Sequence, residues 1–177
     1  LWSGKEKNRA SAICKFCDTD FYGTDGVNGG IYSVKELIIK VKSLWLSSSK
    51  QIRVLCTGGE PLLQLDSDLI SAFKKEGFYI AIETNGTLPA PEGIDWICMS
   101  PKANTNIKLK SGNEIKVIHP QENYDPNDFM SFDFDDFYIQ PMDSKSYSKN
   151  LKAALDFCMQ NPRWSLSLQT HKILGIK

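Results

Sequence analysis

The sequence contains no long apolar run and no excess of either charge. Its 177 residues include 21 lysines and arginines and 21 aspartates and glutamates, so the formal net charge is zero. A protein that tracks nucleic acid carries a basic excess, and a membrane span needs about 18 consecutive apolar residues. We therefore expect neither nucleic acid nor a membrane as a partner. Leu1 is not a starting methionine and no charged-then-apolar leader precedes it, so we expect a cytoplasmic protein whose N-terminus is missing from this sequence.

Cysteines are few and unevenly spaced. There are five, an odd number, whereas a secreted disulfide scaffold is denser and usually even. Cys14 and Cys17 form the one close pair, which in a cytosolic chain indicates metal or redox chemistry. We interpret Cys56, Cys98 and Cys158 as small buried hydrophobes, as free cysteines commonly are.

The composition is that of an ordinary globular domain. Hydrophobic residues make up 41% and charged residues 24% of the chain, and 177 residues is a little over one typical domain. Residues 1–32 are polar and contain five glycines, so they read as a long loop, and such loops are usually functional. We treat residues 1–177 as a single domain, with 1–32 as a loop region that carries the cysteine pair.

Short apolar segments alternate with amphipathic ones along the rest of the chain. Strands are expected at residues 52–57, 78–83, 94–99, 114–118, 137–140 and 164–168. Helices are expected after the capping box of Ser33 and Glu36, after a cap at Asp66 or Ser67, and over residues 146–160. A short helix is also expected after Asp125, which precedes a proline at the first helical position. Strands that are apolar on both faces are typical of a parallel sheet with helical crossovers. The sequence therefore predicts an α/β fold with a mainly parallel sheet of about six strands, either a partial (β/α) barrel or an open sheet.

Polar or glycine-bearing loops follow most of the expected strands. They lie at residues 57–60, 83–86, 100–102, 140–143 and 169–171. Ligands of parallel α/β folds bind at the edge where the strands' carboxyl ends meet. Five such loops on one edge predict a ligand site there.

Two motifs carry chemistry that their residue types explain. Cys14 and Cys17 could give two thiolates to one soft metal or to an iron–sulfur cluster, but a third ligand must come from elsewhere, and we expect it upstream of Leu1. Gly58 and Gly59 would let a ligand approach the backbone, and Glu60 could pair with an amine. A tight turn between strand and helix explains the same glycines equally well.

Taken together, the motifs resemble those of the radical S-adenosylmethionine (SAM) enzymes, and within them the 7-carboxy-7-deazaguanine synthases. The similarity runs essentially end to end and is to the form with fourteen residues between its first two cluster cysteines. It rests on CKFCDTDF at 14–21, TGGEPLLQLD at 57–66, ETNGT at 83–87, SPK at 100–102, QPMD at 140–143 and SLQTHK at 167–172.

The resemblance implies an activity and its cofactors. Three cysteines would hold a 4Fe–4S cluster, SAM would be cleaved to a 5′-deoxyadenosyl radical and regenerated, and Mg²⁺ would assist. The substrate would be 6-carboxy-5,6,7,8-tetrahydropterin, and ring contraction with loss of ammonia would give 7-carboxy-7-deazaguanine for queuosine and related deazapurines. Such an enzyme is a carbon–nitrogen lyase, a homodimer, and a partner of a flavodoxin- or ferredoxin-type reductant.

The resemblance also implies roles for single residues. Cys14 and Cys17 would bind the cluster, Thr19 would bind Mg²⁺, and Thr57, His171 and Lys177 would contact the substrate. The residues carried over as SAM contacts are Gly58, Gly59, Glu60, Ser100, Pro101, Lys102, Gln140, Pro141, Met142 and Asp143. No catalytic side chain is expected beyond the cluster and SAM, and Arg9, Glu83 and Asn85 stay without a role.

Two other functions are weighed against this one. The chain could be a radical SAM enzyme with another substrate, such as a glycyl-radical activase. It could also be a non-enzymatic zinc-binding module built on Cys14 and Cys17, which would leave the five polar loops unexplained.

Overall fold

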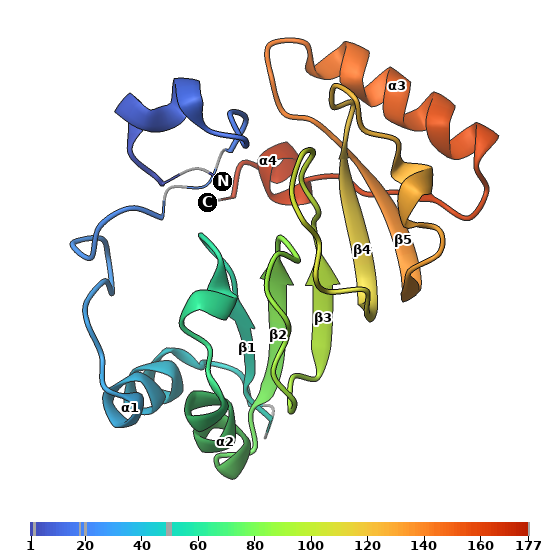
Figure 1. Ribbon diagram of the computed structural model, residues 1–177. Coiled ribbons are helices and arrows are strands. Elements are labelled where there is room, and N and C mark those ends of the chain that lie inside the picture. The colour runs from blue at the N-terminus through green and yellow to red at the C-terminus, as the bar shows by residue number, and fades with distance from the viewer. Residues whose placement is uncertain (2, 18, 20, 49–50, 177) are drawn as a thin grey trace.

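Six parallel strands form a single sheet in the order in which they occur in the chain (Figure 1). The computed structural model describes residues 1, 3–17, 19, 21–48 and 51–176. The strands are β1 (Arg53–Cys56), β2 (Tyr79–Thr84), β3 (Trp96–Met99), β4 (Ser111–His119), β5 (Asp133–Pro141) and β6 (Ser165–Leu166). The predicted α/β class, the parallel sheet and the number of strands are confirmed.

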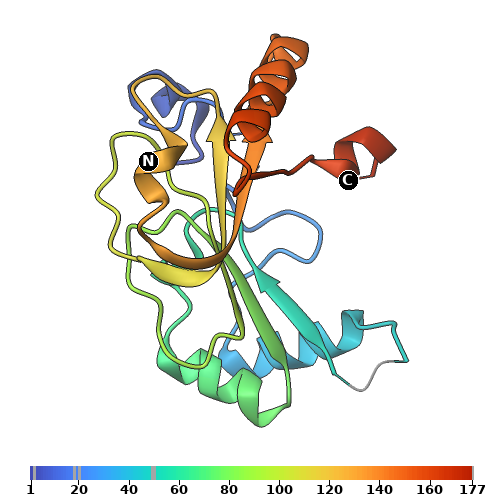
Figure 2. The ribbon, with the colours of Figure 1, turned by 90° about the vertical axis from the view of Figure 1, so that its right-hand side faces the viewer.

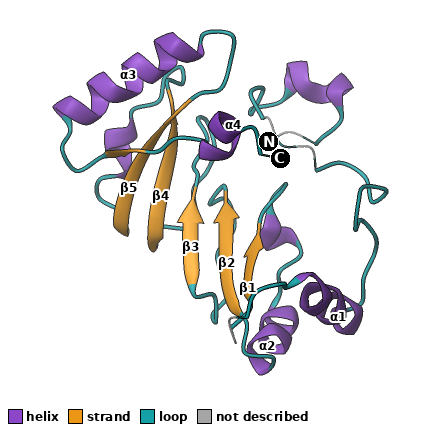
Figure 3. Ribbon diagram, turned by 180° about the vertical axis from the view of Figure 1, so that it is seen from behind, coloured by secondary structure: helices purple, strands orange, loops and turns teal. Residues whose placement is uncertain are grey.

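In the part of the chain that the structure describes, four α-helices and three short 3₁₀ helices accompany the sheet. They are η1 (Glu6–Ser11), α1 (Val34–Leu44), η2 (Pro61–Leu63), α2 (Ser67–Lys75), η3 (Pro126–Phe129), α3 (Tyr147–Gln160) and α4 (Thr170–Leu174). Figure 3 distinguishes them from the strands and loops. Each helix that the structure describes falls short of the length and apolarity that crossing a membrane requires.

The local signals that begin these helices are those read from the sequence. Ser33 and Glu36 form a reciprocal capping box at α1, and the Asp66 carboxylate accepts the backbone N–H of Leu69 at α2. Asp125 caps η3 in the same way, with proline at its first position. Side-chain caps therefore set where these elements start.

Two fully described connections between strands contain no helix, and the sequence predicts no helix at either place. Residues 85–95, between β2 and β3, and residues 100–110, between β3 and β4, are loops. β4 and β5 are longer than predicted, while β6 has two residues. Long loops therefore connect the strands in the middle of the sheet.

The helices cover one face of the sheet in two groups. α1 and α2 pack against β1 and β2 around Phe73, Ile80 and Ile82, and α3 packs against β4 and β5 around Ile139 and Ala154. Figure 2 shows the two groups at opposite ends of the twisted sheet. Burying these side chains stabilises each group by about 1.5–3 kcal/mol per large residue, as an upper estimate.

The other face of the sheet carries polar side chains. Glu83 on β2 is in register with Cys98 on β3, and Cys98 is in register with Glu114 on β4. Neighbours in register point to the same face, opposite to that of Ile82 and Ile115. The sheet thus presents a row of polar groups on the face opposite to α1, α2 and α3.

Candidate active site

A cavity of about 900 Å³ lies at the carboxyl ends of the strands, between the sheet and the N-terminal loop. All six strands or the loops that follow them contribute lining residues, as do residues within 1–21. The sequence-predicted residues among them are Cys14, Cys17, Thr19, Thr57, Gly58, Gly59, Glu60, Ser100, Lys102, Gln140 and His171. Segments far apart in the sequence therefore meet in one place, as the strand-end loops predicted.

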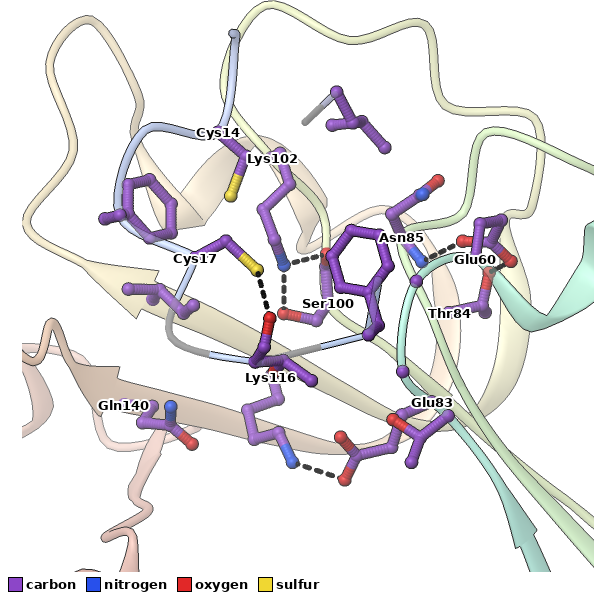
Figure 4. Close-up of a pocket in the computed structure, with 18 of the residues that line it drawn as sticks. Cys14, Cys17, Glu60, Glu83, Thr84, Asn85, Ser100, Lys102, Lys116 and Gln140 are labelled. Carbon is purple, nitrogen blue, oxygen red and sulfur yellow. Dashed lines mark hydrogen bonds and ion pairs between the residues drawn. The ribbon is translucent and has the colours of Figure 1, made fainter. Parts of the chain in front are cut away.

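The two cysteines of the pair lie at this cavity beside an ammonium group (Figure 4). Cys14 is buried and Cys17 is half-buried. Lys102 donates hydrogen bonds of 2.6 Å to the carbonyl and to the hydroxyl of Ser100. Burial raises the pKa of the Cys14 thiol, and the charge of Lys102 opposes that rise. Burial likewise lowers the pKa of Lys102, while the two thiols oppose the change.

The other three cysteines are placed differently. Cys98 is buried and its Sγ lies 3.4 Å from a carboxylate oxygen of Glu114, whereas Cys56 and Cys158 are half-buried. Burial raises the pKa of each thiol. None of the three lines the cavity, and the prediction that each is buried holds for Cys98, whereas Cys56 and Cys158 are half-buried.

Gly58 and Gly59 connect β1 to η2 beside an aromatic ring. Gly58 has a φ of +109°, a value that side chains disfavour, and a Cβ at Gly59 would lie 3.2 Å from the ring of Phe21. The turn and the packing of Phe21 both require small residues here. The glycines therefore serve the fold as well as opening the backbone to the cavity.

The carboxylate of Glu60 is occupied within the chain. It accepts hydrogen bonds from the Thr84 hydroxyl at 2.6 Å, the Asn85 backbone N–H at 2.8 Å and the Leu62 backbone N–H at 3.1 Å. Glu60 thus joins the loop after β1 to the end of β2. Its contact with a SAM amine stays a prediction.

An ion-pair network that sequence reasoning missed lies at the cavity. The ammonium of Lys116 lies 3.0 Å from a Glu83 carboxylate oxygen and 3.9 Å from one of Glu114. Burial on its own would lower the pKa of Lys116, but the acidic side chains around it outweigh burial and raise that pKa. The available signal was two charged residues at alternate positions inside an expected strand, Glu114 and Lys116.

The QPMD segment faces the cavity through its first residue alone. Gln140 lines the cavity, Pro141 is buried at the end of β5, and the Met142 carbonyl accepts a hydrogen bond from Asn150. Asp143 forms an ion pair with Lys172 of α4. Pro101, after β3, is also buried and away from the lining. SAM contacts at Pro101, Pro141, Met142 and Asp143 stay predictions, and Lys177 lies outside the described residues.

The donor set at the cavity suits an iron–sulfur cluster in part. Two thiols three residues apart face one cavity beside the positive charge of Lys102. That charge favours the negatively charged thiolate form, which is the form that binds an iron–sulfur cluster. Within the described residues, no three His, Cys, Asp or Glu side chains are grouped as a metal site. Cys14 and Cys17 therefore fit as two of the three expected ligands. Thr19 contributes a hydroxyl, a hard ligand suited to Mg²⁺.

Comparison with known proteins identifies the class of enzyme to which the chain belongs. The model of the radical SAM superfamily matches residues 8–130, so the chain belongs to that superfamily. A solved structure described as QueE from Escherichia coli shares the fold, with a TM-score of 0.57 and 24% identity over 78% of this chain and 64% of that one.

Relatives of known name narrow the class further. A protein of Burkholderia multivorans is 51% identical over 99% of this chain and 84% of its own length, and one of Bradyrhizobium diazoefficiens is 49% identical over 100% and 85%. Both are named 7-carboxy-7-deazaguanine synthase, as is a Haemophilus influenzae protein at 32% identity over 93% and 79%. The chain belongs to the 7-carboxy-7-deazaguanine synthase family.

Proposed function

We propose that this chain is a carbon–nitrogen lyase that converts 6-carboxy-5,6,7,8-tetrahydropterin to 7-carboxy-7-deazaguanine with loss of ammonia, in queuosine biosynthesis. The observation that carries the proposal is the meeting of Cys14, Cys17 and the six strand ends at one cavity, in a chain 51% identical to a protein of that name. Neither a glycyl-radical activase nor a zinc-binding module accounts for both findings.

We assign cluster binding to Cys14 and Cys17. A 4Fe–4S cluster bound there would supply the electron that cleaves SAM reductively. Both thiols lie on one short loop at the cavity, so a ligand bound in the cavity would lie next to the cluster. Lys102 places a positive charge beside them, which suits both thiolate ligands and the carboxylate of SAM.

We assign the remaining cavity residues to orientation of SAM and substrate. The backbone of Gly58 and Gly59 is open to the cavity, and Ser100 and Gln140 line it from two further strands. Thr57 and His171 lie on strand-end segments from opposite edges of the sheet, where they can contact a bound pterin from two sides. Such placement restricts the geometry in which substrate and cofactor meet.

Four further points of the proposal are supported by the family resemblance. They are Mg²⁺ bound at Thr19, a flavodoxin- or ferredoxin-type reductant, a homodimer and a cytoplasmic location. Thr19 lines the cavity and is exposed, so its hydroxyl is accessible to a metal ion.

If Thr19 binds Mg²⁺, added Mg²⁺ should stimulate turnover by the wild-type protein. It should not stimulate turnover by Thr19→Ala with its cluster intact. Equal stimulation of both proteins would contradict the assignment.

The experiment for the proposed function starts from the natural protein purified without oxygen. We expect iron and sulfide in equal amounts and, with reductant, SAM and the pterin, accumulation of 7-carboxy-7-deazaguanine identified by mass spectrometry. Product that requires the pterin supports the proposal. SAM cleavage with no conversion of the pterin indicates a radical SAM enzyme of another specificity, and tightly bound zinc without iron supports the zinc-binding module.

A further inference from the structure

Arg9 connects η1 to the turn that carries the two cysteines. Its Nη1 donates hydrogen bonds of 2.9 Å to the backbone carbonyls of both Lys15 and Cys17. Its Nε donates to the two carboxylate oxygens of Glu6, at 2.8 and 2.9 Å, one turn earlier in η1. The guanidinium therefore holds a carboxylate on one side and two carbonyl groups of the cysteine turn on the other.

This placement is not the by-product of a packed core. No residue of η1 is buried, so polar contacts have a large share in placing this segment. The Arg9 side chain is 29% exposed and Glu6 is 76% exposed. Because guanidinium presents a rigid planar set of donors, its contacts fix both distance and direction.

The two carbonyls that Arg9 binds flank Phe16 and include that of a cysteine. Fixing the backbone at Lys15 and Cys17 restricts the direction of the Cα–Cβ bond of Cys17, and so limits the positions that its Sγ can reach. A flexible turn would lose conformational entropy when its thiolates bind iron, about 1–2 kcal/mol per residue that becomes ordered. A turn that is already held by Arg9 loses less.

We propose that Arg9 is a positioning residue that preorganises the Cys14–Cys17 turn for its cluster. η1 serves as the support from which Arg9 reaches the turn, and Glu6 holds the guanidinium in place. This inference rests on the proposed function, because it takes Cys14 and Cys17 as cluster ligands. The inference assigns a role to the segment between residues 5 and 13, which does not line the cavity.

The test compares variants of Arg9 with a matched variant of Lys7, an exposed lysine of the same helix. Arg9→Gln removes the charge and the paired donors, Arg9→Lys keeps the charge, and Lys7→Gln removes one charge elsewhere on η1. The measurements are the rate of iron release from the reconstituted protein to a ferrous chelator and the thermal unfolding midpoint of the cluster-free protein.

We expect Arg9→Gln to release iron about tenfold faster than wild type, the effect of losing charge-assisted hydrogen bonds. Arg9→Lys should fall between the two, and Lys7→Gln should match wild type. The unfolding midpoint should be unchanged in all of them, because no residue of η1 belongs to the buried core. Should Arg9→Gln fail to fold, the ordering of Arg9→Lys and Lys7→Gln against wild type still decides.

Equal iron release in wild type and the Arg9 variants would overturn the inference. A lowered unfolding midpoint with unchanged iron release would also overturn it, since Arg9 would then act on the fold alone. A wild-type protein that takes up no cluster would instead contradict the proposed function, so the two failures are distinguishable.

Discussion

At the scale of single residues, the environment of each thiol separates cluster ligands from structural cysteines. Cys14 and Cys17 line the cavity near Lys102, whereas Cys158 lies on α3 away from it. We expect Cys14→Ala and Cys17→Ala to reduce the iron content of the purified protein to background, because a cluster held by too few thiolates is lost. Iron and sulfide analysis measures this.

The controls are Cys56→Ala, Cys98→Ala and Cys158→Ala. Each should keep full iron content, since none of these thiols lines the cavity. Cys158→Ala is the best matched, because it changes a half-buried thiol without removing a hydrogen bond to a carboxylate, as Cys98→Ala does. A Cys17 variant with full iron content would show that the ligands have been assigned wrongly.

The ion-pair network at the cavity makes a second prediction at this scale. Lys116 is 17% exposed and neutralises Glu83 and Glu114, so Lys116→Met leaves two close carboxylates without their cation. Because Glu83 is 40% exposed and therefore partly solvated, we expect the free energy of unfolding to fall by about 1–2 kcal/mol. Urea denaturation measures the change.

A double-mutant cycle tests whether the pair itself is responsible. If it is, Lys116→Met combined with Glu83→Gln should destabilise the protein by less than the sum of the single changes, because the first change has already broken the interaction. Strictly additive losses would mean that Lys116 stabilises the protein by other contacts.

At the scale of helices and strands, local signals predicted where elements begin better than which elements connect. Ser33, Asp66 and Asp125 cap the helices expected of them, because capping depends on a few neighbouring residues. No helix is expected from the sequence at residues 85–95 or 100–110, and both are loops. The extra lengths of β4 and β5 were not predicted, because the two strands pair along eight positions and such pairing depends on distant segments, which one sequence does not display.

Asp95 gives a pH-dependent prediction at this scale. It accepts the backbone N–H of Ile80 at 2.7 Å and pairs with Lys74, so it joins β2 to the last turn of α2. Burial would raise the pKa of Asp95, but the hydrogen bond from Ile80 and the charge of Lys74 outweigh burial and lower it. The charged form is thus the one that stabilises the fold.

A carboxyl group with a lowered pKa stabilises the fold above its unfolded pKa, about 4, and loses that effect as the pH falls through its folded pKa. We expect Asp95→Asn to lower the free energy of unfolding by about 1 kcal/mol at neutral pH and by progressively less below pH ~4. Urea denaturation across this range checks it, with the exposed Asp135→Asn as control. A difference that grows toward acid pH would contradict the assignment.

Asp143 has two candidate roles, an ion pair with Lys172 and a contact with SAM, and a charge reversal at Asp143 distinguishes them. In the structure it ties the loop after β5 to α4, which carries His171 to the cavity, while the family resemblance predicts a SAM contact. If the tie matters, Asp143→Lys should raise the Michaelis constant for the pterin up to about fivefold, the limit for an exposed pair. Steady-state kinetics with the pterin and SAM varied in turn measures this.

The exchanged pair supplies the control. Asp143→Lys with Lys172→Asp should restore the pterin constant, because the ion pair forms again with its ends reversed. Failure of the exchange to restore it, together with a raised constant for SAM, would favour the direct SAM contact.

At the scale of the whole molecule, the parallel sheet is what made the site predictable. Loops after parallel strands meet at one edge, so residues as distant as Thr57 and His171 were expected together and line the same cavity. The side-chain directions within each loop were not predictable, because they depend on tertiary contacts. For that reason the sequence predicted neither the ion pair of Asp143 with Lys172 nor the hydrogen bonds that Glu60 accepts from Thr84 and Asn85.

The roles of residues on the face of the sheet opposite to α1, α2 and α3 were the hardest to predict from the sequence. Glu114 and Lys116 lie in a strand that was predicted from its apolar residues, and their network with Glu83 joins β4 to β2, with β3 between them. Arg9 likewise acquires its role from a turn six and eight residues later in the chain. Such contacts are formed by the fold and carry no short sequence pattern.

The function proposed for the whole molecule is a SAM-dependent conversion of a pterin to a deazapurine in this cavity. Its most direct test is one anaerobic reaction with reductant, SAM and 6-carboxy-5,6,7,8-tetrahydropterin, in which ammonia and 7-carboxy-7-deazaguanine are quantified together. We expect equal amounts of the two products from the wild-type protein, and neither product from Cys17→Ala. Ammonia and deazapurine that fail to appear from a protein with its full cluster would contradict it.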